Sequence, residues 1–91
     1  MAHVYTTAKQ ATKAIFKAYG LRKSGTAVFH NSILALFFKA NESDTEQQGA
    51  TLAEYYKEQG TPLADVLIFS GRKIYSFAEE KTFTLSSALK S

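Results

Sequence analysis

The segment 26–40, TAVFHNSILALFFKA, constrains the fold of this chain more than any other, because it holds the densest run of large apolar side chains. Six apolar residues, ILALFF, follow one another at 33–38. Such a run is typical of a strand that is buried on both faces, and equally of a helix that is buried all round. Either way the segment belongs to the core, and we expect Leu36 and Phe37 to be buried.

Two structures are compatible with this segment. As a helix from Thr26 it has one apolar stripe, and Leu34 and Phe38 lie outside that stripe. As a hairpin, 27–29 pairs with 33–39 around a turn at His30 and Asn31. We favour the hairpin, because β-branched and aromatic residues prefer strands, a glycine precedes the segment, and asparagine tolerates the left-handed backbone of tight turns.

The chain before this segment predicts a helix between residues 7 and 20. Thr7 and Gln10 have the T-x-x-Q spacing of a capping box, and Gly20 is a natural helix stop. One face of this helix is apolar and is expected to pack on the rest of the protein. Its residues are Ala11, Ala14, Ile15, Ala18 and Tyr19.

A second helix is predicted after a polar, acidic stretch at 41–49, which we interpret as an exposed connection in which 43–46 can begin a helical turn. Thr51 and Glu54 form another capping box, and the helix that it opens ends at Gln59, before a glycine and a proline. We expect three residues of this helix to face the core: Leu52, Ala53 and Tyr56. Its opposite side carries Glu54 and Glu58, which would meet the lysines of the first helix if the two helices packed together.

Residues 65–85 read as a β-meander, with strands at 66–69, 73–77 and 82–85 and turns between them. Residues 86–91 are compatible with one frayed helical turn. An alternative assigns 62–69 to a helix, which would make 51–70 a helix-turn-helix with a wing at 73–85. The supposed recognition helix, PLADVLIFS, is mostly apolar and carries one acid and no base, so the meander is favoured.

These elements predict an α+β fold in a single domain covering residues 1–91. We expect two helices packed on an antiparallel β-sheet, in the order α-β-β-α-β-β-β. A chain of this length can bury roughly 60–65% of the surface of its unfolded state, so one core suffices to hold it together.

Charge is distributed unevenly along the chain. Residues 1–39 carry six bases and no acid, a charge of +6, whereas residues 40–91 carry five bases against eight acids, a charge of −3. This asymmetry indicates an anionic partner for the first half or self-complementary association. The alternative is that the fold brings the two halves together, so that their charges neutralise each other.

The sequence offers little support for enzymatic chemistry. It contains no cysteine, which removes thiol nucleophiles, disulfides and cysteine-ligated zinc. His3 and His30 lack the i, i+4 partner of helical metal sites, and the signature motifs of nucleotide-binding and hydrolytic enzymes are missing. Glu79 and Glu80 are adjacent, but neighbouring carboxylates at a turn point apart. We therefore expect neither catalysis nor a cofactor or metal.

The candidate binding surface is basic. Lys9, Lys13 and Lys17 are spaced four residues apart and share one stripe of the first helix. Like charges at this spacing repel one another, so the stripe does not serve to stabilise the helix. Two further bases and two aromatic residues complete the predicted surface: Arg22, Lys23, Phe16 and Tyr19.

We interpret the chain as a small protein-binding regulator or inhibitor that covers an acidic partner surface with this helix face and with exposed tyrosines. The tyrosines are Tyr5, Tyr19, Tyr55, Tyr56 and Tyr75. The alternative is a DNA- or RNA-binding protein in which the same bases contact phosphates and Phe16 and Tyr19 stack on bases. A homodimer is compatible with either function. No signal peptide or membrane span is visible, and a cytoplasmic location is expected.

Overall fold

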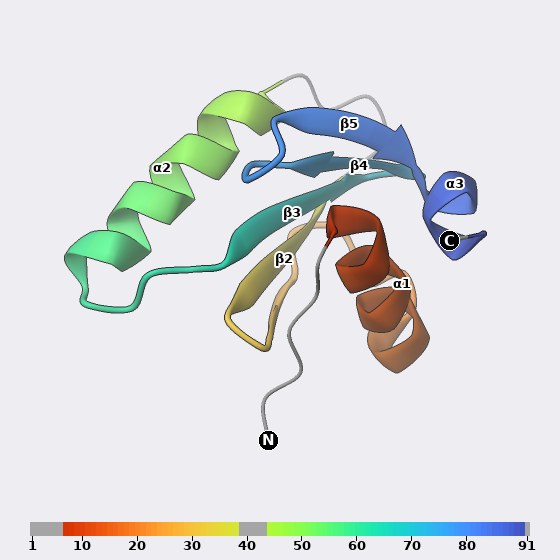
Figure 1. The fold of residues 1–91 in the computed structure, drawn as a ribbon, viewed down its shortest axis with the longest axis horizontal. Coiled ribbons are helices and arrows are strands. Elements are labelled where there is room, and N and C mark those ends of the chain that lie inside the picture. Colours follow the sequence, from red (N-terminus) through yellow and green to blue (C-terminus); the bar gives the residue numbers. More distant parts are fainter. Residues whose placement is uncertain (1–6, 39–43, 91) are drawn as a thin grey trace.

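The computed structural model describes residues 7–38 and 44–90 (Figure 1). The described residues form three helices and five strands. In chain order they are α1 (Ala8–Tyr19), β1 (Ala27–His30), β2 (Ile33–Phe38), α2 (Thr45–Glu58), β3 (Asp65–Ser70), β4 (Lys73–Ser76), β5 (Lys81–Thr84) and α3 (Leu85–Leu89). The α+β class is therefore confirmed, and a third, short helix replaces the frayed turn expected at the end of the chain.

The five strands form one sheet in the order β1-β2-β3-β4-β5. The pair β2/β3 is parallel, with Ile33 opposite Asp65, and the other three pairs are antiparallel. The expected fully antiparallel sheet is thus wrong. Helix α2 carries the chain back across the sheet, so the strand that follows it runs in the same direction as β2. β3 lies at the centre and is buried along its whole length.

The helices cover the two faces of this sheet separately. Figure 1 shows α2 on one side of the sheet and α1 and α3 on the other. Side chains alternate accordingly: Ile33, Ala35 and Phe37 join the core beneath α1 and α3, whereas Leu36 and Phe38 pack with the core beneath α2. Phe37 is buried as expected and Leu36 is half-buried. The apolar run of β2 is continuous because both of its faces are covered.

The hairpin favoured for residues 26–40 is confirmed, since β1 and β2 pair in antiparallel register. The turn lies one residue later than expected. Asn31 and Ser32 both have positive φ, 50° and 66°, as in type I′ turns, while His30 is the last residue of β1 and lies opposite Ile33. Two residues with positive φ match the right-handed twist of the flanking strands. The predicted pairing of Lys39 lies outside the described residues.

Helix α1 begins and ends as the sequence predicts. The hydroxyl of Thr7 accepts a hydrogen bond from the backbone N–H of Gln10 at 3.1 Å, and Gly20 follows the helix with φ of 70°. The buried face is rotated from the expected one, because α1 packs against α3 as well as on the sheet. Ala18 is exposed, and the buried residues are Ala8, Ala11, Thr12 and Ile15.

Helix α2 starts at Thr45, seven residues before the Leu52 at which the capping box placed its first residue, so Thr51 lies inside the helix and residues 45–49 are not an exposed connection. The T-x-x-E pattern misled because the preceding residues are mostly good helix formers. Gly49 is buried where α2 approaches the sheet, and a Cβ there would lie 3.3 Å from side-chain atoms of Tyr75 and Phe77. The glycine lowers helix propensity but permits this close approach.

Residues 65–70 form the central strand, so the helix that the helix-turn-helix alternative placed there is excluded. The strands of the meander are confirmed, each shifted by no more than one residue at either end from its expected bounds.

Thr12 provides a first test of the packing of α1. Its side chain is fully buried, and its hydroxyl has no hydrogen-bond partner within residues 7–38 and 44–90. Thr12→Val keeps the shape and removes the unpaired hydroxyl, so we expect the free energy of unfolding to rise by about 1 kcal/mol in urea denaturation. The control, Thr12→Ser, keeps the hydroxyl and loses a buried methyl group, and it should be less stable than the wild type. A valine variant that is less stable than the wild type would contradict this packing.

Candidate functional site

In the lysine stripe, Lys13 and Lys17 lie on the outer side of α1, whereas Lys9 lies next to the edge strand β5. Lys13 and Lys17 are exposed and Lys9 is half-buried. The burial of Ala8, Ala11, Thr12 and Ile15 on the opposite side of the helix holds the two exposed lysines outward. Arg22 and Lys23 follow the end of α1 in an exposed segment that leads into β1. We call Lys9, Lys13, Lys17, Arg22 and Lys23 the basic α1 surface.

The two aromatic residues of the predicted site brace the helix. Phe16 is half-buried and packs against the core beneath α1. Tyr19 lies edge-on to His30, with ring centroids 5.8 Å apart, and its hydroxyl donates to the carbonyl of Phe29 at 3.5 Å. Neither ring is a free platform on which a base could stack. His30, for which the sequence favours a turn or partly buried position over a catalytic role, is half-buried and takes part in this packing.

The acids of α2 do not meet the basic α1 surface. Glu54 and Glu58 are exposed on a helix that covers the opposite face of the sheet (Figure 1). The two helices therefore do not pack together, so the alternative in which these glutamates neutralise the lysines of the first helix is excluded. The sequence predicts that both helices pack on the sheet. The face that α2 covers is decided by the crossover from β2 to β3, which the sequence pattern does not define. The structure thus separates a basic face from an acidic one.

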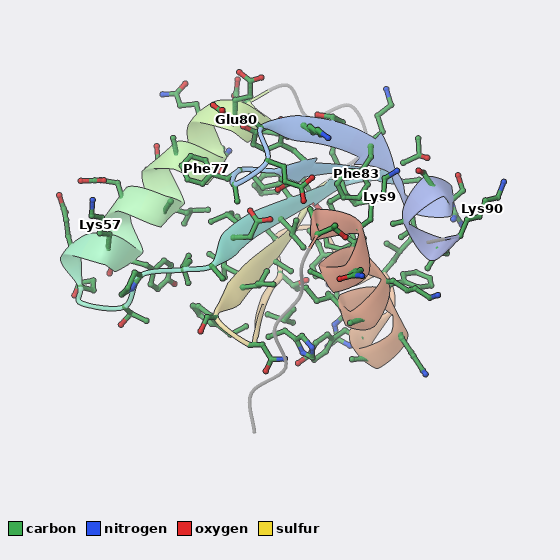
Figure 2. All side chains as sticks on the ribbon, viewed as in Figure 1. Lys9, Lys57, Phe77, Glu80, Phe83 and Lys90 are labelled. Atoms are coloured by element: carbon green, nitrogen blue, oxygen red, sulfur yellow. The ribbon has the colours of Figure 1, made fainter. Side chains whose placement is uncertain are left out.

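Sequence reasoning missed a cleft at the N-terminal end of α1. This cleft, of about 630 Å³, lies between α1 and the edge strand β5, and Figure 2 shows Lys9 beside Phe83 there. Lys81 and Thr82 of β5 also line it, as does Glu79. Lys81 adds a base to the neighbourhood of Lys9. The alternation of side chains along a strand could have indicated that Lys81 and Phe83 share one face of β5. In the structure, Phe83 packs on the core beneath α1.

A buried carboxylate organises the turn next to this cleft. Asp65, at the start of β3, accepts hydrogen bonds from the backbone N–H groups of Val66 and Ala78, at 2.7 and 2.9 Å, and from the hydroxyl of Ser76 at 2.7 Å. Burial raises the pKa of Asp65 above its ordinary value, although these hydrogen bonds act in the opposite direction. No sequence pattern predicted that this aspartate is buried, because an acid before a strand is usually exposed.

The same network reaches helix α1. The hydroxyl of Ser76 accepts from the backbone N–H of Glu79 at 3.1 Å, and a carboxylate oxygen of Glu79 accepts from the backbone N–H of Ala8 at 2.5 Å. A carboxylate at the start of a helix satisfies a free N–H group and opposes the positive end of the helix dipole. Asp65 and Glu79 line a cleft of about 240 Å³. All of these contacts join β3, β4 and α1, which indicates that Asp65 and Glu79 have a structural role.

The prediction that Tyr75 is one of the exposed tyrosines is wrong, because this side chain is buried beneath α2. Burial raises its pKa, and the charges of Glu46 and Glu80 add to that effect. Tyr55 is exposed and Tyr56 is half-buried, and their rings are in contact at 5.2 Å. Tyr5 lies outside the described residues.

Within residues 7–38 and 44–90, no group of three histidine, aspartate or glutamate side chains is placed to hold a metal ion. In the same part of the chain, every helix is too short or too polar to cross a membrane. The fold and its surfaces define the class to which the protein belongs: a small α+β domain with a five-stranded mixed sheet and a basic helix face. Comparison with protein families, curated proteins and solved structures found no match.

Proposed function

We propose that the protein is a non-enzymatic binding module whose basic α1 surface contacts an acidic surface on a partner protein. The observation that carries this proposal is the separation of charge across the sheet. The five bases lie on and just after α1, whereas the exposed glutamates of α2 lie on the other face. A surface of one sign attracts partners of the opposite sign and speeds their encounter.

The half-buried rings of Phe16 and Tyr19 favour a protein partner over single-stranded nucleic acid. Proteins that bind single strands rely on aromatic rings that are open to stacking. Here both rings are engaged in holding α1 to the rest of the protein. The second candidate function, contact with the phosphates of DNA or RNA, rests on the exposed lysines of α1 and needs no stacking.

We expect the triple variant Lys9→Glu, Lys13→Glu, Lys17→Glu to fold normally and to lose binding to acidic ligands. The probes are a fluorescein-labelled polyglutamate peptide and labelled single- and double-stranded DNA and RNA, measured by fluorescence anisotropy at low and at physiological salt. Reversal of three charges should weaken binding of the polyglutamate peptide by at least about tenfold, or 1.4 kcal/mol. Polyglutamate binding alone supports a protein partner, whereas equal or tighter nucleic-acid binding that weakens steeply with salt supports the second candidate.

A matched control distinguishes the effect of the basic α1 surface on binding from the effect of the net charge. The variant Lys57→Glu, Arg72→Glu, Lys73→Glu also replaces three exposed bases with acids, so both triple variants change the charge from +3 to −3. Figure 2 shows Lys57 on α2, at the far side of the molecule from Lys9. The control should bind more tightly than the α1 variant. Equal losses in the two variants would show that net charge alone attracts the probes, and unchanged binding in the α1 variant would refute the proposal.

A further inference from the structure

Strand β1 is an edge strand of the sheet. The strand order places β1 and β5 at the two edges, and within residues 7–38 and 44–90 the neighbour of β1 is β2 alone. Edge strands offer unpaired N–H and C=O groups to other chains, and proteins usually protect them with charges or proline. β5 begins with Lys81, whereas β1, Ala-Val-Phe-His, contains neither a lysine nor an acid. β1 is thus the less protected edge.

The hydrogen bonds of the hairpin define which groups of β1 point outward. The backbone N–H of Phe37 donates to the carbonyl of Thr26 at 2.9 Å, so Thr26 directs its carbonyl toward β2. In an antiparallel pair this direction alternates along the strand. Val28 therefore also faces β2, and Ala27 and Phe29 direct their N–H and C=O groups away from the sheet. The Tyr19 hydroxyl at 3.5 Å from the carbonyl of Phe29 leaves that oxygen able to accept a second hydrogen bond.

Exposed aromatic rings lie along the same edge. Phe29 is 50% exposed and Tyr55 is 53% exposed. Within residues 7–38 and 44–90, no other large hydrophobic side chain is as exposed. Phe29 contacts Tyr56 at 5.3 Å between ring centroids, and Tyr56 contacts Tyr55 at 5.2 Å. Phe29, Tyr55 and Tyr56 thus form one continuous aromatic strip where α2 reaches the edge of the sheet. Apolar surface beside free backbone groups is typical of a site where a strand docks.

We propose that the occupant of this edge is a second copy of the same chain, paired antiparallel through β1 about a two-fold axis at Val28. In this register Ala27 of one copy lies opposite Phe29 of the other, and the outward groups of these residues form four hydrogen bonds across the axis. The match is self-complementary, because the small side chain of Ala27 leaves room for the ring of Phe29 on the same face. The axis stands perpendicular to the sheet, so the aromatic strips of both copies lie on one face and cover each other.

The first test is the mass of the protein in solution. We expect sedimentation equilibrium to give about 20 kDa, twice the 10.0 kDa of one chain, at concentrations of tens of micromolar. Ala27→Pro removes one outward N–H and leaves the bonds to β2 intact, so it should give a folded monomer. The control, Leu89→Ser, alters a residue that is 38% exposed on α3, which follows β5 at the opposite edge of the sheet, and should leave the dimer unchanged. A monomeric wild type, or an Ala27→Pro variant that remains dimeric, would overturn the proposal.

The second test fixes the register. The protein has no cysteine, so Val28→Cys places one thiol in each copy. Residues directly opposite each other in a non-hydrogen-bonded pair have Cα atoms about 4.5 Å apart, within the range that a disulfide spans. Mild oxidation should convert Val28→Cys to a covalent dimer and leave the control, Ser86→Cys on α3, largely monomeric. A dimer without this cross-link would show that the copies associate elsewhere. The proposal does not depend on the basic α1 surface.

Discussion

Replacing Phe37 with alanine is expected to lower the free energy of unfolding by about 3–5 kcal/mol, because large-to-small changes in a packed core leave a cavity. Phe37 is 2% exposed and stacks on Phe69 of β3, with ring centroids 4.7 Å apart. It lies beneath α1, at the parallel β2/β3 pair that joins the hairpin to the meander. Small domains are stable by only about 5–15 kcal/mol, so this loss removes a large part of the total.

Urea denaturation at low protein concentration measures the effect of this substitution. The matched control is Phe29→Ala on the same hairpin, where the ring is 50% exposed and the loss should be less than half as large. A Phe37→Ala variant that unfolds cooperatively at the wild-type midpoint would show that the core is assigned wrongly.

Replacing Asp65 with alanine is expected to cost about 2–4 kcal/mol. The substitution leaves the N–H groups of Val66 and Ala78 and the hydroxyl of Ser76 without their acceptor, and each unsatisfied buried donor costs about 1–3 kcal/mol. Asp65→Asn retains one oxygen for the two N–H groups and should lose less. An alanine variant as stable as the wild type would contradict the network.

The pH dependence of stability separates Asp65→Asn from the wild type. The pKa of Asp65 is raised from its ordinary 3.8 in the folded protein, so the folded state binds this proton more tightly than the unfolded state. The stability that the group contributes is therefore fully present below pH 3.8 and is lost as the pH rises through the raised pKa. Across this window, the stability of the wild type should fall relative to that of Asp65→Asn. A difference that is constant with pH would contradict the raised pKa.

The sequence predicts local structure well where backbone chemistry decides it. Thr7, Gln10 and Gly20 mark the ends of α1, and the Asn-containing turn marks the hairpin. A helical turn was expected at 43–46, but its continuity with the helix after Thr51 was missed, because a capping box inside a run of helix formers does not stop the helix from extending backwards. The parallel pairing of β2 and β3 was also missed, since pairing depends on where α2 crosses the sheet and no local pattern encodes it.

The candidate site shows the same limit. The helical period alone places Lys9, Lys13 and Lys17 on one stripe, and in the structure Lys13 and Lys17 are exposed while Lys9 is half-buried. Whether Glu54 and Glu58 meet them depends on which face α2 covers. Lys81, more than sixty residues further along the chain, lines a cleft with Lys9 because β5 forms the sheet edge next to α1. The burial of Asp65 likewise follows from the β4–β5 turn folding over it.

The basic α1 surface is where we propose that the protein meets an acidic partner. The most direct measurement is a titration of ¹⁵N-labelled protein with the polyglutamate peptide, followed by amide chemical shifts at low and at physiological salt. We predict that the largest shifts fall on α1 and on residues 22 and 23, and that they shrink as salt rises. Shifts centred on α2, or no shifts even at low salt, would contradict the claim.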